Sequence, residues 1–238
     1  MPDLHVLRVF TDEHGGGGNP LGVFLAGDAV PRARRQDVAA EIGFSETVFV
    51  DDAARGVVQI FTPAVEIAFA GHPLVGTAWL LARERVALEM LRPPAGEVPT
   101  RLDGYRTFVA GRPEWPPPYE WFELGSPAAV EALEGAPEGH DLAGAYAWAG
   151  EDTVRARVFP ARLGIDEDEA TGGAAVVLGA RLGRDVEIHQ GRGSVIAVRP
   201  RDDGLIEIGG RTVLDEVRDF CSPTCTSTTS RGLSLIHI

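Results

Sequence analysis

The stretch FTPAVEIAFAGHPLVGTAWLLARERV, from Phe61 to Val86, carries the clearest fold signal in this chain of 238 residues. An apolar strand that ends near Phe61 leads through a glycine turn into a helix. The apolar residues of that helix cover too wide an arc for a helix with one face in water. They are Leu74, Val75, Ala78, Leu81 and Ala82. We therefore expect this helix to be buried on most sides.

A weaker copy of this pattern returns in the second half of the chain. Val158-Phe159 resembles Ile60-Phe61, and Gly172-Gly173-Ala174 resembles Gly76-Thr77-Ala78. In each half, an apolar strand that ends near an acid or an imidazole leads into a helix rich in glycine and alanine. Such an internal repeat predicts a mixed α/β (α+β) fold with two pseudo-symmetric domains. Each domain would be a curved sheet or barrel around one buried central helix.

Strand and helix signals extend outward from both copies. Residues 31–43 predict a helix that begins at a proline and ends at a glycine. Alternation and β-rich runs predict strands elsewhere. They cover 4–11, 21–27, 46–52, 56–62, 153–159, 185–191, 194–198, 205–209 and 211–217. Prolines in 91–104 and 111–121 indicate connections, so we predict domains at 1–100 and 101–220.

Residues 221–238, CSPTCTSTTSRGLSLIHI, break with the composition before them and look foreign to the fold. Both cysteines, Cys221 and Cys225, lie here. A disulfide framework and a thiol nucleophile in the folded body are therefore excluded. With His237 the cysteines offer three zinc ligands at most, and we predict no metal site.

Charge and composition exclude several classes of function. The chain has 22 basic and 35 acidic residues and a formal net charge of −13. A surface this acidic disfavours nucleic acids and anionic membranes. With no apolar run long enough to span a bilayer and no signal-peptide pattern at the start, we expect a cytoplasmic protein. All 22 basic residues are arginine, which excludes chemistry that needs a lysine amine, such as Schiff-base catalysis.

Glu46 is a candidate acid/base group at the start of a predicted strand. It follows Ser45 and lies between the apolar residues Phe44 and Val48. Such surroundings would desolvate the carboxyl group and raise its pKa towards neutrality, where a glutamate both donates and accepts protons. The alternative is a solvated acid at a strand edge.

His72 and Asp168 occupy matching places before the two predicted buried helices. The positive end of the helix would keep the His72 imidazole neutral, although the residue could simply mark a helix start. Asp168 could be an N-cap, a ligand contact or both. Two helix starts aimed at one interface would hold a carboxylate or an enolate-like intermediate. Asn19, the only asparagine, follows four glycines and is either a ligand contact or a turn residue.

Four ordered motifs resemble the PhzF-like phenazine-biosynthesis family. They are GNPLGVFL (18–25), FSETVFV (44–50), FTPAVEIAFAGHPLVGTA (61–78) and EDEATGGAA (167–175). The resemblance implies a diaminopimelate-epimerase-type fold with the active site between the two domains. It also implies an isomerase that works without a cofactor, a small carboxylate-bearing substrate and a homodimer.

The same resemblance implies roles for individual residues. Glu46 would carry the proton, with His72 and Asp168 as its partners in the cleft. The expected substrate-binding residues are Asn19, Ser45, Gly71, Pro73, Gly172 and Gly173. Gly173 departs from the family's usual serine, which removes a hydroxyl that could hold substrate. The segment 111–155 is also shortened, so the motifs do not identify the substrate.

Two other functions are compatible with these residues. Ser45, His72 and Asp168 could form a hydrolase triad, although no nucleophile elbow surrounds Ser45. Alternatively, the protein could bind a small molecule without turning it over.

Overall fold

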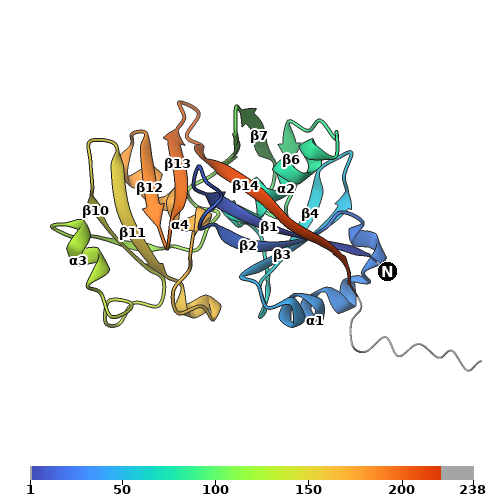
Figure 1. The fold of residues 1–238 in the computed structure, drawn as a ribbon, viewed down its shortest axis with the longest axis horizontal. Helices are drawn as coiled ribbons and strands as arrows, with labels where there is room; N and C mark the ends of the chain where they lie inside the picture. The colour runs from blue at the N-terminus through green and yellow to red at the C-terminus, as the bar shows by residue number, and fades with distance from the viewer. Residues whose placement is uncertain (1, 221–238) are drawn as a thin grey trace, which may run out of the picture.

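Strands of both halves join into one 14-stranded sheet that curves around two helices (Figure 1). The computed structural model describes residues 2–220. The strands of the first half are β1 (Asp3–Thr11), β2 (Asn19–Phe24), β3 (Glu46–Asp52), β4 (Val57–Phe61), β5 (Glu66–Ile67), β6 (Met90–Leu91), β7 (Val98–Asp103) and β8 (Arg106–Gly111). Those of the second are β9 (Glu120–Glu123), β10 (Ala143–Trp148), β11 (Thr153–Phe159), β12 (Val186–Gln190), β13 (Ser194–Pro200) and β14 (Ile206–Asp219).

The α-helices are α1 (Arg32–Ile42), α2 (Gly71–Arg83), α3 (Pro127–Glu131) and α4 (Gly172–Leu182). Short 3-10 turns lie at Gly27–Ala29 and Ala161–Leu163. The predicted helix at 31–43 is confirmed: α1 ends at Gly43, whose φ of 72° lies in the left-handed region that glycine adopts without strain. No helix within residues 2–220 has both the length and the apolar character needed to cross a membrane.

Strand β14 joins the two halves of the sheet. Its first residues pair antiparallel with β8 on one side and β13 on the other. From Arg211 to Asp219 it pairs instead with β1. The main strand order is β5-β4-β3-β2-β1-β14-β13-β12-β11-β10-β9, and β8 leads from β14 to β7 and β6. Figure 1 shows β14 starting beside β13 near the centre of the molecule and running alongside β1 across the right-hand group of strands.

The predicted burial of the first central helix is confirmed. Helix α2 packs against β1, β2, β8 and β14, and Leu74, Val75 and Leu80 are fully buried. Helix α4 packs against β13 and β14, and its start contacts the start of α2. Each half therefore wraps its strands around one helix, as the mixed two-lobed fold requires.

The resemblance of Gly172-Gly173-Ala174 to Gly76-Thr77-Ala78, which the sequence shows with a slip of about two residues, does not mark equivalent positions in the two helices. Gly172 is the first residue of α4, whereas Gly76 lies in the second turn of α2. The counterpart of Gly172 is Gly71, the first residue of α2. Gly76 and Gly172 look alike in sequence only because both helices are rich in small residues.

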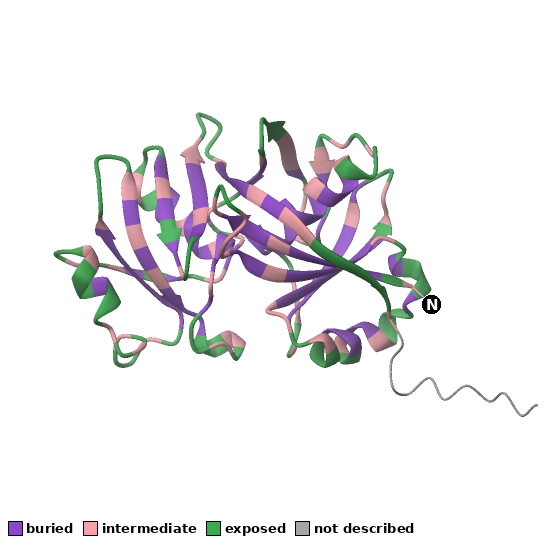
Figure 2. Ribbon diagram, in the orientation of Figure 1, coloured by how far each residue is buried: buried purple, intermediate pink, exposed green. Residues whose placement is uncertain are grey.

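Two apolar clusters fill the molecule. The larger surrounds α2 and α4 and runs through both halves, and the smaller lies under α1. Figure 2 shows buried strands on both sides of β14 and an exposed final stretch of β14. The predicted domain boundary at residue 100 falls inside β7. The division of the chain into domains at 1–100 and 101–220 stays a prediction. Cys221, Cys225 and the rest of 221–238 lie outside the described residues.

Candidate active site

Glu46 and His72 meet where the first residues of β3 and α2 come together. Glu46 opens β3, and His72 is the second residue of α2. Their side chains are 11% and 3% exposed, and 3.4 Å separates Glu46 Oε2 from His72 Nε2. The predicted desolvation of Glu46 is therefore present in the fold.

His72 faces Glu46 as a hydrogen-bond acceptor. Its ring forms a hydrogen bond with the backbone of Pro20, and since proline has no N–H, the ring donates to the carbonyl oxygen. Nε2 is the ring nitrogen without a hydrogen bond, so Nδ1 is the donor and Nε2 presents its lone pair to Glu46. Burial lowers the pKa of His72 to about 3, so the ring is neutral near pH 7.

Glu46 keeps its proton to an unusually high pH. Burial raises its pKa to about 8, and the nearby charge of Asp168 adds to this shift, while a hydrogen bond with Ser45 opposes it. A neutral carboxylic acid also suits the lone pair of His72, because an ionised carboxylate would face it as a second acceptor. Near neutral pH, Glu46 can both give and take a proton.

Asp168 is held by a network that crosses between the two halves. Asn19 donates from Nδ2 to Asp168 Oδ1 at 2.7 Å and to the carbonyl of Ala170 at 2.9 Å. Thr171 Oγ1 donates to Asp168 Oδ2 at 2.7 Å, and Ser45 Oγ donates to Asn19 Oδ1 at 3.0 Å. Burial raises the pKa of Asp168 to about 6, although the bonds from Thr171 and Asn19 lower it.

Thr171 and Gln190 belong to this network but were missed in the sequence. Gln190 donates from Nε2 to the carbonyl of Asp168 at 2.8 Å and to Thr171 Oγ1 at 3.0 Å. Its Oε1 accepts from the backbone N–H of Thr171 at 3.3 Å. Thr171 directly precedes α4, and that position could have identified it. Gln190 comes from β12, and nothing in its local sequence predicts this contact.

The starts of α2 and α4 lie against each other. A Cβ atom on Gly71 would come within 2.7 Å of Gly172 Cα, and one on Gly172 would come within 2.7 Å of the His72 nitrogen. Only glycine allows this approach of two backbones. No side chain caps either helix, which leaves first-turn N–H groups for an anion.

A small cavity lies over these two helix starts. It has a volume of about 40 Å³, enough for one or two water molecules. Three of the expected substrate-binding residues, Gly71, Gly172 and Gly173, line it together with Glu46, His72 and Asp168. The other lining residues are Ile67, Phe69, Ala70, Pro117, Tyr119, Leu163 and Thr171.

The remaining expected substrate-binding residues lie behind the cavity wall. Asn19 and Ser45 are part of the network behind Asp168, and Pro73 is a buried residue in the first turn of α2. Gly173 faces the proline-rich segment, since a Cβ there would lie 3.3 Å from Pro116 Cβ. The substrate contacts of all these residues stay predictions.

The hydrolase triad is not formed. Ser45 Oγ donates to Asn19, the Asp168 oxygens accept from Asn19 and Thr171, and His72 bonds to Pro20. A triad instead requires the histidine to bridge the serine and the acid. Within residues 2–220, no group of three or more His, Cys, Asp or Glu side chains is placed to hold a metal ion.

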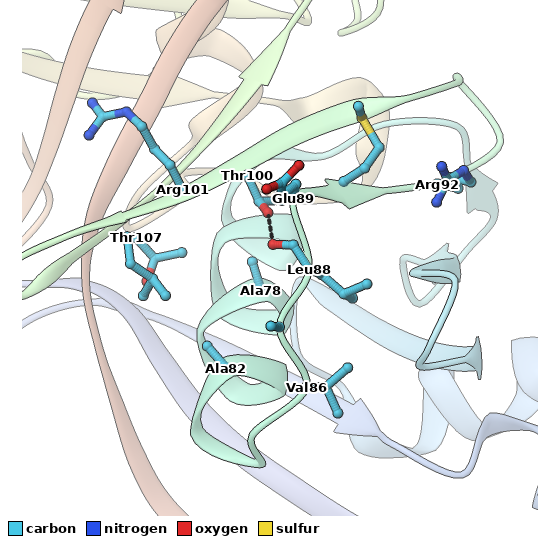
Figure 3. Close-up of a pocket in the computed structure, with 12 residues that line it drawn as sticks. Ala78, Ala82, Val86, Leu88, Glu89, Arg92, Thr100, Arg101 and Thr107 are labelled. Atoms are coloured by element: carbon cyan, nitrogen blue, oxygen red, sulfur yellow. Dashed lines mark hydrogen bonds between the residues drawn. The ribbon is translucent and has the colours of Figure 1, made fainter.

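A larger pocket of about 610 Å³ lies between α2 and the β6–β7 region (Figure 3). Its wall is mainly apolar, and Thr100 donates a hydrogen bond from its hydroxyl to the Leu88 carbonyl. Glu89, Arg92 and Arg101 are its charged residues. It lacks the buried carboxyl pair and the paired helix starts of the small cavity, so the small cavity is the candidate active site.

Comparison with known proteins gives consistent matches. The family model for phenazine biosynthesis-like protein (PhzC-PhzF) matches residues 7–115. The trans-2,3-dihydro-3-hydroxyanthranilate isomerase of Pseudomonas fluorescens is 30% identical over 220 residues, covering 74% of this chain and 78% of the relative.

Solved structures show the same fold. A putative phenazine biosynthesis PhzC/PhzF protein from Clostridium difficile has a TM-score of 0.76 at 19% identity and covers 93% of this chain and 100% of its own. A probable proline racemase from Agrobacterium radiobacter has a TM-score of 0.62 at 11% identity and covers 95% of each chain. The two-lobed epimerase-type architecture predicted from the sequence is thereby confirmed.

Proposed function

The chain belongs to the phenazine biosynthesis-like family, and from this premise we propose that it is a cofactor-independent isomerase in which Glu46 moves a proton on a small carboxylate-bearing substrate. Relatives that cover most of the chain are named isomerases. The observation that carries the proposal is the buried Glu46 carboxyl group, which faces a neutral His72 and lies beside two uncapped helix starts.

The proton transfer balances on Glu46 alone. In its ionised form, Glu46 takes a proton from a substrate carbon, and the electron pair of the broken C–H bond passes into the conjugated system. The protonated Glu46 then returns the proton to a different carbon, which restores the carboxylate and gives an isomer. Nothing is oxidised or reduced, and a pKa of about 8 allows both steps near neutral pH.

The helix starts provide the site for the carboxylate of the substrate. The first-turn N–H groups of α2 and α4 lie at the cavity, and each helix adds partial positive charge there. Asp168, held by Asn19 and Thr171, would accept a hydrogen bond from a donor on the substrate, such as an amino group.

A six-membered ring with substituents needs more room than about 40 Å³. Substrate binding must therefore widen the cavity. Pro117, Tyr119 and Leu163 from the second half face the residues of the first half across it. Small movements of these walls would admit a ring while the helix starts stay in contact.

The first substrate to test is trans-2,3-dihydro-3-hydroxyanthranilate, which the Pseudomonas relatives carry in their names. Wild-type protein in D2O should isomerise it and leave deuterium on the carbon that gains the proton. Glu46→Gln should reduce isomerisation and deuterium uptake at least about 10³-fold, because an amide cannot take up and return the proton.

Glu89→Gln is the matched control, since Glu89 is an exposed glutamate on the wall of the larger pocket. This variant should match the wild type. Activity lost in Glu89→Gln but kept in Glu46→Gln would move the reaction to the larger pocket. If the compound stabilises the wild type but is never converted, the chain is a binding protein.

A further inference from the structure

Tyr119 enters the candidate active site from a segment that the sequence marks as a connection. Pro116, Pro117 and Pro118 precede it, and its backbone N–H donates to the Pro117 carbonyl at 2.8 Å. Strand β9 begins at the next residue, so both ends of this turn are fixed. Pro116 packs over Gly173, while Pro117 and Tyr119 line the cavity.

The hydroxyl group of Tyr119 is not paired with any other group of the fold. The residue is 7% exposed, and within the described residues its hydroxyl forms no hydrogen bond. Tyr146, which is also buried, donates to Glu123 Oε2 at 2.8 Å. Within the described residues the Tyr119 hydroxyl is not one of the enclosed polar atoms without a partner, so it keeps some contact with solvent and can exchange that contact for a hydrogen bond to a ligand.

The surroundings of Tyr119 make it a donor. Burial and the charges of Asp168 and Glu46 hold the pKa of Tyr119 above its usual range, so the phenol stays protonated. Both oxygens of Asp168 already accept hydrogen bonds from Asn19 and Thr171. Each of these oxygens could accept a second hydrogen bond, but the phenol donates to neither of them, so its proton is available to a ligand.

We propose that Tyr119 donates a hydrogen bond to an oxygen atom of the substrate other than its carboxylate, and so selects substrates that carry a hydroxyl or carbonyl group near the reacting carbons. This inference rests on the proposed function, which assigns the carboxylate to the helix starts. Tyr119 lies within electrostatic reach of Glu46 and Asp168, where those carbons would be.

The same hydrogen bond would also assist the reaction. When Glu46 takes a proton from a carbon conjugated with a carbonyl group, the electron pair moves towards the carbonyl oxygen; a hydroxyl oxygen takes up no such charge, and there the hydrogen bond only positions the substrate. A fixed donor stabilises the charge as it develops, and removal of such donors commonly lowers kcat about 10²-fold or more. Tyr119→Phe should therefore lower kcat more than it changes KM.

The binding test compares two stable ligands that differ by one hydroxyl group, 3-hydroxyanthranilate and anthranilate. Isothermal titration should show that the wild type binds 3-hydroxyanthranilate about 5- to 10-fold more tightly, which is the usual effect of one neutral hydrogen bond. Tyr119→Phe should lose this preference and bind anthranilate as the wild type does. Tyr146→Phe, which removes a buried phenol outside the site, should keep the preference.

The outcomes separate this inference from the proposed function. An equal preference in wild type and Tyr119→Phe overturns the role of Tyr119 and leaves the isomerase proposal standing. Equal wild-type affinities for the two ligands overturn it without any variant. If neither ligand binds the wild type, the proposed ring-carboxylate substrate class fails, and the role of Tyr119 fails with it.

Discussion

Glu46 and His72 are both neutral near pH 7, for opposite reasons. Burial raises the pKa of the acid to about 8 and lowers the pKa of the imidazole to about 3. Each group therefore avoids a buried charge, which would be expensive in this apolar interior. The neutral acid and the neutral acceptor face each other at 3.4 Å without forming an ion pair, and neither Glu46 Oε2 nor His72 Nε2 has a hydrogen-bond partner within the described residues.

This arrangement makes the stability of the wild type depend on pH between 6.5 and 8. In this range the unfolded chain has already lost the Glu46 proton, whereas the folded protein keeps it until pH passes about 8. Folded protein therefore binds more protons, and its free energy of unfolding should fall by about 1.5 kcal/mol as pH rises from 6.5 to 8. His72 opposes this slope by about 0.4 kcal/mol near pH 6.5, because the unfolded ring is still half protonated there whereas the folded ring is neutral.

Urea unfolding of the wild type and Glu46→Gln at several pH values checks this prediction. The glutamine variant should lose most of the fall in unfolding free energy, since it has no proton to release. Glu89→Gln should follow the wild type. A fall of the same size in Glu46→Gln would show that other groups cause it.

The starts of α2 and α4 touch through two glycines, and a side chain on either glycine should push the helices apart. Gly71→Ala places a methyl carbon 2.7 Å from Gly172 Cα and 2.3 Å from Ile208 Cδ1, so the helices must separate. Overpacking of this kind costs about 1–3 kcal/mol, and the moved N–H groups should also weaken ligand binding. Gly125→Ala is the control, because a Cβ there meets nothing within 4 Å; its stability should change by less than about 0.5 kcal/mol. Equal effects of the two variants, measured by thermal and urea unfolding, would contradict the proposed role of this contact.

The sequence predicted the elements whose local pattern is strong. Helix α1, helix α2 and strands β3 and β11 have clear periodicity or end signals, and the structure has them near the expected bounds. It missed β10, whose AGAYAW sequence has alanine or glycine at four of its six positions, residues that are depleted in strands, although Tyr146 and Trp148 favour them. It also divided β14 in two at Gly209 and Gly210, although pairing with strands on both sides keeps that strand continuous.

The site residues, like the elements, were predicted where the local sequence pattern is strong and missed where distant contacts decide. Glu46, His72 and Asp168 precede or begin regular elements, so their sequence neighbours indicated them, and the fold brings them to one cavity. Tyr119 was missed because prolines usually mark a connection. Its place in the cavity depends on the packing of Pro116 against α4, a contact between residues 57 positions apart.

The two halves share the strand and the apolar core that hold each of them together. Strand β14 pairs with β1 of one half and β13 of the other, and the larger apolar cluster runs through both. Asn19 and Asp168 also link β2 to the segment before α4. One half cannot unfold without exposing apolar surface and breaking strand pairs of its neighbour.

We therefore predict that the two halves unfold in one cooperative transition. In hydrogen exchange with mass spectrometry at increasing urea concentrations, the most protected amides of β3 and β11 should give the same opening free energy within about 1 kcal/mol. Gly71→Ala should lower both values equally, although the substitution lies in the first half. Residues 215–219 are exposed and should exchange earlier through local opening. If β11 kept the wild-type value while β3 weakened, the halves would unfold separately, and the shared strand and core would not couple them.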